Sequence, residues 1–372
     1  MSRPWIRGAL VSAVFGALVA GLVGWGTAIP AAATTRPSGI GRVGVVSNLI
    51  FSSEAETARE LERVRAGGVQ WDREAFYWSL VEPARGRFDW RRSDALMTGA
   101  SVAGVNVLAV LAFSAPWASS DPSGRGSVYY PPQDPADFAR YATAVVQRYG
   151  PRGSFWAAQP KLIPRPLQAI EVWNEPWWHG FWAPRADPSG YAALVRTTGA
   201  AIRQVAPGVS ILVSGDLLGD GTAGNDPWLT QLLDVRPSIA PYVDVWSVHP
   251  YPDPKSQGPR GGPIQYSYER VPLIAQTVAA AGVRRPIWIT EIGWSSASHN
   301  SDGVSESTQA RYLHDALVEA LTTWRGTVAR TFVYDWTEDS GRANDLEGHF
   351  ALLGSDGRSK PAWNTVQQLA SR

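Results

Sequence analysis

Short runs of apolar residues recur along this chain, separated by longer segments in which apolar residues return at helical spacing. The runs are rich in β-branched and aromatic residues and are bounded by polar, Gly or Pro positions, which is typical of buried strands. Eight strands are predicted, at 42–48, 69–73, 105–111, 170–173, 209–215, 243–249, 287–294 and 331–336.

Amphipathic segments lie between these runs, and the clearest of them predict helices at 54–65, 137–149, 191–205 and 360–369. Strands that alternate with helices indicate parallel βαβ units, and eight such units predict a single (β/α)8 barrel of the α/β class. A doubly wound open sheet is the alternative. It is disfavoured because no Gly-rich phosphate loop follows the first strand. No repeat or low-complexity linker divides residues 41–372, which we expect to form one domain.

The N-terminus has the pattern of an export signal. Arg3 and Arg7 precede an uncharged apolar run at 9–23, and the small residues at 26–33 supply an Ala-x-Ala cleavage site. We therefore expect 1–33 to be a signal peptide, 34–40 a short tether, and the folded part to be secreted or extracytoplasmic. An uncleaved anchor is the alternative, and only in that case is membrane contact expected.

Composition excludes several classes of function. A net charge of +1 gives no general attraction to nucleic acid or anionic membranes. The absence of cysteine removes thiol catalysis and zinc–thiolate sites, and the five histidines show no metal-binding spacing. We expect neither a metal nor another cofactor, and the sequence does not determine oligomeric state. Eighteen tryptophans are many for 372 residues and favour stacking surfaces as well as core packing.

Two glutamates, Glu175 and Glu291, each close an apolar strand and are followed closely by tryptophan. Apolar surroundings keep a carboxyl group protonated at neutral pH, as a general acid requires. Taken alone, each could be an ordinary strand-end residue. In a parallel barrel, however, the carboxyl ends of all strands meet at the active-site face. The polar or aromatic residues expected there are Arg73, Asn174, Glu175, His249, Tyr251, Glu291 and Trp336.

A pair of carboxyl groups is what glycoside hydrolysis requires. In the retaining version of this reaction, one carboxylate attacks the anomeric carbon while the other protonates the leaving oxygen and later activates water. A buried Glu171 is expected two residues before Trp173 on the same strand face, where it would need a cation such as Arg73 as partner. We assign Glu171 a supporting structural role.

Several motifs resemble those of the clan A retaining glycoside hydrolases, which include the family 5 cellulases and the family 39 xylosidases. The most specific are Trp-Asn-Glu-Pro at 173–176 and Ile-Thr-Glu-Ile-Gly-Trp at 289–294. Others lie at 78–83, 86–90, 249–251 and 356–362, so the likeness extends over nearly the whole predicted barrel. One departure is the stretch 113–117, which lacks the His that many family 5 members carry after the third strand.

This resemblance implies a role for each candidate residue. Glu175 would be the acid/base and Glu291 the nucleophile. Asn174 would bind the sugar 2-OH, Arg73 and Tyr251 would keep Glu291 ionised, and His249 would orient Glu175. Trp336 would form the floor of the subsite at the scissile bond.

The tryptophans of the neighbouring loops are candidate sugar platforms, because indole rings stack on the C–H faces of sugars. We expect loop packing to account for at least half of them, so an endo-acting polysaccharide hydrolase is only mildly favoured over an exo-acting glycosidase. A non-catalytic barrel that binds cell-surface polysaccharide is the alternative function, whereas a metal-dependent deacetylase lacks the necessary His and Asp cluster. The candidates are Trp78, Trp117, Trp177, Trp178, Trp182, Trp294 and Trp336.

Overall fold

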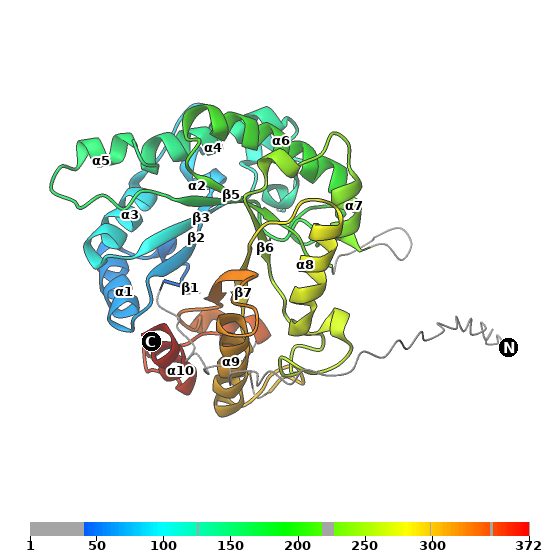
Figure 1. The fold of residues 1–372 in the computed structure, drawn as a ribbon. Coiled ribbons are helices and arrows are strands. Elements are labelled where there is room, and N and C mark those ends of the chain that lie inside the picture. Colours follow the sequence, from blue (N-terminus) through cyan, green and yellow to red (C-terminus); the bar gives the residue numbers. More distant parts are fainter. Residues whose placement is uncertain (1–40, 125, 218–226, 298, 343–344, 372) are drawn as a thin grey trace, which may run out of the picture. The chain divides into compact units, whose positions relative to one another are not determined.

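A closed barrel of eight parallel strands forms the centre of the protein, as the alternating pattern predicts (Figure 1). The computed structural model describes residues 41–124, 126–217, 227–297, 299–342 and 345–371. Each strand pairs with its neighbours in sequence, and β8 closes the ring against β1. The strands are β1 (Val43–Val46), β2 (Trp71–Tyr77), β3 (Asn106–Ala112), β4 (Ala169–Val172), β5 (Ser210–Ser214), β6 (Val245–Val248), β7 (Ile287–Ile292) and β8 (Val328–Val333).

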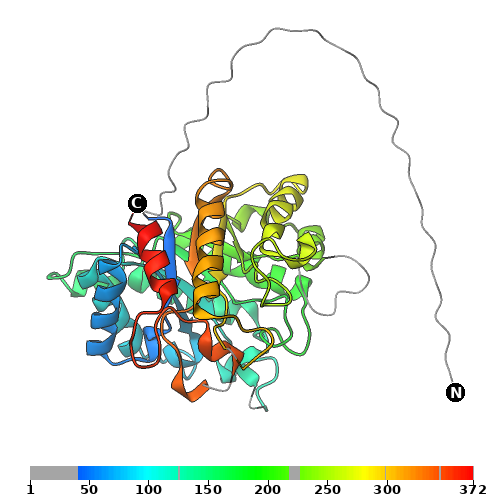
Figure 2. The same ribbon diagram turned by 90° about the horizontal axis from the view of Figure 1, so that it is seen from below.

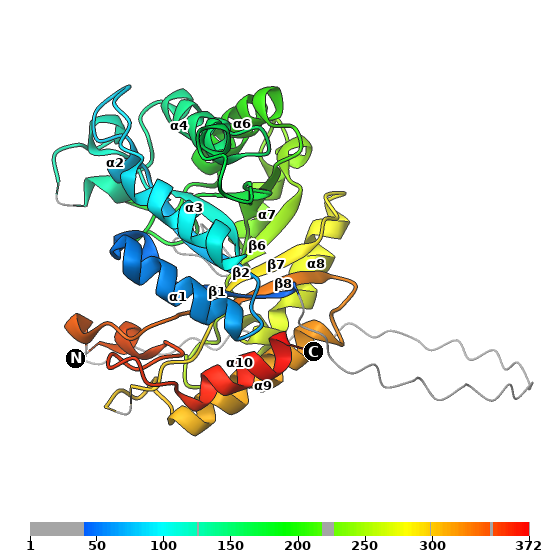
Figure 3. The ribbon, with the colours of Figure 1, turned by 90° about the vertical axis from the view of Figure 1, so that its left-hand side faces the viewer.

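Helices surround the barrel and cover the outward faces of the strands (Figure 1). Figure 2 shows α10 beside α9, and Figure 3 shows α1 running next to α3, in agreement with their residue contacts. The helices are α1 (Glu54–Ala66), α2 (Trp78–Val81), α3 (Arg91–Ala103), α4 (Pro135–Tyr149), α5 (Ser154–Ala158), α6 (Pro188–Val205), α7 (Trp228–Asp234), α8 (Val271–Ala280), α9 (Glu306–Leu321) and α10 (Pro361–Ala370).

Capping residues determine where several helices begin. The hydroxyl of Ser53 accepts the Glu56 N–H at the start of α1. Asp134 and Asp187 cap α4 and α6 in the same way, and each helix then begins with proline, which is well tolerated at a first helical position. These two helices start earlier than the apolar pattern predicts because their first turns are polar.

A packed cluster of side chains fills part of the barrel interior. Trp71, Trp288 and Phe332 pack against one another among inward-facing aliphatic residues. The guanidinium of Arg330 lies 4.3 Å from the Trp71 ring centroid and 4.5 Å from that of Trp288. Gly44 leaves room for this core, because a Cβ there would approach Phe332 to 2.5 Å.

Two strand ends differ from their predicted positions. Arg73, expected where the second strand ends, is the third residue of β2 and pairs in register with Val46 and Leu108. β8 ends at Val333, so Trp336 lies beyond the strand. Both predictions were wrong because apolar runs do not reveal how far pairing continues through polar residues.

The expectations for 1–33 and 34–40 lie outside the described residues. Within the described part of the chain, none of the helices is long and apolar enough to cross a membrane.

Candidate active site

A pocket of about 810 Å³ opens at the C-terminal ends of the strands. Loops after β1, β3, β4, β6 and β8 form its walls, and β2 and β7 contribute residues from the strands themselves. Its polar lining includes six of the residues that the sequence predicts at this face: Arg73, Asn174, Glu175, His249, Tyr251 and Glu291. The structure thus brings both predicted glutamates into one cavity.

An unusual backbone turn directs Glu175 into the pocket. Trp173 and Glu175 have φ values of 67° and 45°, a left-handed region that non-glycine residues rarely adopt. The turn is held because the Trp173 N–H donates to Leu111 O at 3.0 Å and its indole N–H donates to Phe181 O at 2.8 Å. Such conformations persist where the surroundings fix them, and they concentrate at functional sites.

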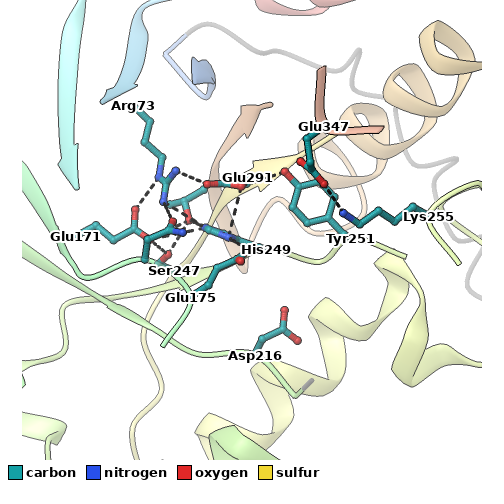
Figure 4. A network of polar contacts seen from close by, with 12 residues as sticks. Arg73, Glu171, Glu175, Asp216, Ser247, His249, Tyr251, Lys255, Glu291 and Glu347 are labelled. Carbon is teal, nitrogen blue, oxygen red and sulfur yellow. Dashed lines mark hydrogen bonds and ion pairs between the residues drawn. The ribbon is translucent and has the colours of Figure 1, made fainter. Parts of the chain in front are cut away.

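Arg73 links the groups of the site (Figure 4). Its side chain is 4% exposed and extends from the middle of β2. Nε donates to Glu171 at 2.8 Å, Nη1 to Glu291 at 2.5 Å and Nη2 to Asn174 Oδ1 at 2.8 Å. Nη2 also approaches His249 Nε2 at 3.4 Å. Because a guanidinium only donates, it fixes the Asn174 side chain with its NH₂ group away from Arg73.

Glu291 lies in surroundings that favour its ionised form. Burial opposes ionisation, but the charges of His249 and Arg73 outweigh it, together with hydrogen bonds from Tyr251 and Arg73. The pKa of Glu291 is therefore lowered from its ordinary value. The Tyr251 hydroxyl donates to Glu291 Oε2 at 3.0 Å, opposite the oxygen that Arg73 holds. Glu291 thus meets the electrostatic requirement for a nucleophilic carboxylate.

Glu175 lies close to Glu291 and has a different partner. His249 Nδ1 is 2.7 Å from Glu175 Oε1 and 3.7 Å from Glu291 Oε2. Carboxylate oxygens of the two glutamates lie within 4.8 Å of each other. This close approach is compatible with the roughly 5–5.5 Å carboxyl separation of direct nucleophilic attack, rather than with the roughly 6.5–9.5 Å that leaves room for a water molecule in inversion.

The hydrogen-bond network also assigns the proton on His249. Arg73 can only donate toward Nε2, so in the neutral ring the proton is on Nδ1 and is donated to Glu175. Burial lowers the pKa of His249, but the charge of Glu291 and the hydrogen bond with Glu175 raise it, and the net shift is upward. His249 therefore contacts one oxygen of Glu175, and the two neighbouring carboxyl groups favour its protonated form.

Glu171 is fully buried beside Arg73. Besides its ion pair with Arg73, one carboxylate oxygen accepts the hydroxyl of Ser247 and the Thr290 hydroxyl at 3.3 Å. This is the supporting position that the strand periodicity predicts. Glu171 balances the charge of Arg73 on the side away from the pocket.

Arg270 is a supporting residue that the sequence did not indicate. It lies just before α8 and is 1% exposed. Its guanidinium hydrogen-bonds backbone oxygens of the segment after β6. Its nitrogens donate to His249 O at 2.9 Å and Tyr251 O at 2.7 Å, and Asp216 binds it through two oxygens at 2.8 and 3.0 Å. Arg270 therefore fixes the backbone that carries two side chains of the site. A lone Arg ahead of an apolar helix gives no sequence signal of such a role.

Most of the predicted sugar platforms pack in the protein instead. Among the described residues that line the pocket, the tryptophans are Trp177 and Trp178. Trp177 is buried and meets the His249 ring edge-on at 5.6 Å, whereas Trp178 is 41% exposed. The substrate-binding assignment therefore needs correction for the five others, which pack among protein side chains: Trp78, Trp117, Trp182, Trp294 and Trp336.

Trp336 shows the physical reason for this correction. Because the chain leaves the barrel after Val333, the indole packs edge-on against Trp363 at 4.8 Å and donates to Glu60 at 3.1 Å. Trp78 and Trp117 likewise donate their indole N–H groups to Glu82, at 2.6 and 2.9 Å. Tyr334 rather than Trp336 is the β8 aromatic residue that lines the pocket.

The two sides of the pocket differ in chemistry. Aromatic rings from β2 and the loops after β3 and β4 form one wall: Tyr77, Phe113, Tyr129, Trp178 and Phe181. On the opposite side, Lys255 forms an ion pair with Glu347 at 2.8 Å, beside Tyr251 (Figure 4).

Glu175, His249 and Glu291 are also the one group of described residues close enough to share a metal ion. Their ligand atoms already hydrogen-bond one another, Arg73 and Tyr251, and the buried guanidinium supplies the local positive charge. These ligand atoms therefore already have hydrogen-bond partners in the protein.

Comparison with known proteins supports the architecture. Neither a protein-family model nor a curated protein matches the sequence. Among solved structures, the chain is similar to a family 39 glycoside hydrolase from the gut symbiont Bacteroides cellulosilyticus WH2, with 22% identity and a TM-score of 0.66. The match covers 89% of this chain and 63% of that one, so this chain spans under two thirds of that structure.

Two further structures show the same barrel. GH5_18 from Streptomyces cattleya, solved in complex with GlcNAc, is 19% identical with a TM-score of 0.61, covering 90% of this chain and 80% of that one. The endo-β-1,4-mannanase from Thermotoga petrophila is 15% identical with a TM-score of 0.57, and the match covers 88% of this chain and 76% of that one. The fold is therefore that of family 39 and family 5 glycoside hydrolases, as the motifs predicted.

Proposed function

We propose that this protein is a secreted retaining O-glycoside hydrolase that acts on β-linked oligo- or polysaccharides. The observation that carries the proposal is the separation of Glu175 and Glu291, whose carboxylate oxygens lie within 4.8 Å of each other. Their partners differ as the two roles require, with Arg73 and Tyr251 on Glu291 and His249 on Glu175. A barrel that only bound polysaccharide would not need this asymmetry.

In the first step, Glu291 attacks the anomeric carbon and the glycosidic C–O bond breaks. The proton of Glu175 passes to the leaving oxygen, and the electron pair of the broken bond stays on that oxygen. Glu175 becomes a carboxylate at this point, and the Nδ1–H of His249 stabilises the new charge through the existing hydrogen bond. Arg73 and Tyr251 hold Glu291 ionised until it forms the glycosyl ester.

In the second step, the same groups act in reverse. Glu175 removes a proton from water, the water oxygen attacks the anomeric carbon, and the ester bond to Glu291 breaks. Two inversions at one carbon leave its configuration unchanged. Asn174 contributes in both steps, because Arg73 occupies its oxygen and its NH₂ group remains to donate to the sugar 2-OH.

The proposal extends to substrate class and location. The mannosidase from Opitutaceae strain TAV5 and the Thermotoga mannanase, both structurally similar, are described as acting on β-1,4 linkages. The apolar segment at 9–23 supports export. The aromatic wall on the Glu175 side suits the leaving portion of a glycan.

The test is a panel of aryl β-glycosides with wild-type protein, Glu291→Ala and Glu175→Ala. We expect Glu291→Ala to lose turnover and to regain part of it with azide, giving a glycosyl azide of inverted configuration. Glu175→Ala should retain activity mainly on substrates whose leaving group needs no proton. Glu62→Ala is the control, because Glu62 is exposed on α1. Wild-type turnover by Glu291→Ala would reject the proposal.

A further inference from the structure

Asn48, directly after β1, has a side-chain amide that lines the pocket and makes no hydrogen bond to any described residue. Its backbone is left-handed, with φ of 56°. Asn adopts this region more readily than most residues, so the conformation itself is not exceptional. A polar group without a protein partner in a catalytic pocket is available to a ligand.

The position of Asn48 in the barrel indicates which part of a substrate it faces. β1 pairs with β2 and β8, and in the closed ring it lies two strands from β7, which carries Glu291, but three strands from β4, which Glu175 follows. The leaving portion of a glycoside must lie at Glu175, which protonates it. The sugar that becomes attached to Glu291, the glycone, therefore extends toward β8 and β1. Asn48 lies on that side.

A buried cluster beneath the loop holds Asn48 in place. The Ser47 hydroxyl is 2.9 Å from Asp72 Oδ2 and 2.5 Å from Glu74 Oε1. Glu74 also accepts the N–H of Leu49 at 2.5 Å and, more weakly, that of Ile50 at 3.4 Å. Glu74 thus binds the residues on both sides of Asn48.

The cluster must contain an additional proton. A serine hydroxyl has one hydrogen and cannot donate to two carboxylates at once. Glu74 also accepts from two backbone N–H groups, which favours it as the charged acceptor. Ser47 therefore donates its hydrogen to Glu74, and a protonated Asp72 donates to Ser47. The second oxygen of Asp72 is buried without a partner, which is tolerable for a neutral carboxyl group but costly for a charged one. Burial and the neighbouring Glu74 also raise the pKa of Asp72 well above its ordinary value.

From this arrangement we propose that Asn48 is a specificity-determining residue that hydrogen-bonds a hydroxyl of the glycone sugar, and that the Asp72–Ser47–Glu74 cluster is its positioning device. The inference rests on the proposed glycosidase function. It assigns Asn48 a role separate from Asn174, which faces the sugar 2-OH from β4. The ligand it implies is a sugar with a free hydroxyl on the side away from the leaving group.

The test uses Asn48→Gly, which removes the amide but keeps the left-handed backbone accessible. On the best aryl glycoside of the panel, we expect kcat/KM to fall roughly 3- to 10-fold, the effect of one neutral hydrogen bond. Monodeoxy versions of that substrate identify the hydroxyl: one deoxygenation should reduce wild-type kcat/KM and have little further effect on Asn48→Gly.

Three variants test the positioning cluster. Glu74→Gln should reduce kcat/KM in the same direction as Asn48→Gly, and the double variant should lose little more than the worse single one. Asp72→Asn should stay near wild type, because an amide can replace a neutral acid as donor to Ser47. A thermal melt of each variant identifies loss of folding. If Glu74→Gln does not fold, the deoxy-substrate comparison between wild type and Asn48→Gly still tests whether Asn48 contacts a glycone hydroxyl.

Several outcomes overturn the inference while leaving the glycosidase proposal intact. These are unchanged kcat/KM in Asn48→Gly, an unchanged deoxy-substrate profile, or full additivity with Glu74→Gln, each alongside an inactive Glu291→Ala. If wild-type protein turns over no glycoside, the proposed function itself fails.

Discussion

Arg73 donates to Glu291 at 2.5 Å from the middle of a strand rather than from its end. The long side chain brings a buried positive charge up the barrel interior, where Glu171 balances it from below. Glu291 is therefore held by a preorganised cation whose own side chain is almost fully buried. Removal of that cation should alter both the rate and the pH dependence of the reaction.

Arg73→Met should lower kcat/KM by about 100-fold or more, because removing the cation of a buried ion pair leaves the carboxylates of Glu171 and Glu291 uncompensated, at about 3–5 kcal/mol. The pKa of Glu291 is lowered in the wild type, so Glu291 is ionised at pH values where a free Glu is partly protonated. Loss of Arg73 raises that pKa, and the acid limb of the kcat/KM profile should move to higher pH. An unchanged acid limb in a folded, weakened variant would show that Arg73 does not control the ionisation of Glu291.

Arg270→Lys should reduce kcat without a matching change in KM, because Lys cannot hold the carbonyls of His249 and Tyr251 and both oxygens of Asp216 together. We expect a decrease of about 10-fold or more, since a displaced site loses near-attack geometry. Steady-state kinetics with a thermal melt measure this, and Arg260→Lys, at an exposed ion pair, is the matched control. Equal kinetics in both variants would contradict a positioning role.

Two tryptophan variants separate sugar contact from packing. Trp178→Ala should raise KM for oligosaccharides with little effect on stability, because its ring is partly exposed in the pocket. Trp336→Ala should instead lower the free energy of unfolding by about 3–5 kcal/mol, the usual effect of truncating a buried aromatic ring. Urea unfolding and kinetics on both variants provide the comparison. A stable Trp336→Ala with raised KM would restore the role predicted from sequence.

The Asp72–Ser47–Glu74 cluster should make stability depend on pH. Burial raises the pKa of Glu74 to about 7, although Ser47 and two backbone N–H groups oppose the shift, and the pKa of Asp72 is also raised. A carboxyl group with a raised folded pKa stabilises the fold while protonated, and that contribution is lost as pH rises. Wild-type protein should therefore lose stability relative to Asp72→Asn as the pH rises above the ordinary range of a carboxyl group, measured in urea titrations. A constant difference would show that no proton is held in the cluster.

The sequence predicted that Glu175 and Glu291 lie in one pocket, because this prediction needs only the topology of the fold. Apolar runs locate the strands, and in a parallel barrel all strand ends meet at one face, so Glu175 and Glu291 were expected to converge. Glu171 followed from the two-residue period of its strand. These inferences use alternation and chain order, which the residue pattern records directly.

Other parts of the site depend on three-dimensional packing that the pattern does not record. β2 continues through Asp72, Arg73 and Glu74 because each of these side chains has at least one buried hydrogen-bond partner, and no local sequence signal indicates those partners. Whether Trp336 lines the pocket or packs in the protein depends on where β8 ends. For Trp178 it depends on how its loop folds. Asn48 and Arg270 lie in segments of ordinary composition, and only the coordinates show what surrounds them.

The most direct test of the central claim is to trap the glycosyl-enzyme with a 2-deoxy-2-fluoro aryl glycoside and identify the labelled residue by peptide mass spectrometry. The account predicts one sugar per protein, attached to Glu291, with activity lost in proportion to labelling. A label on another residue, or hydrolysis of an active substrate with inverted configuration and no trapped ester, would contradict it.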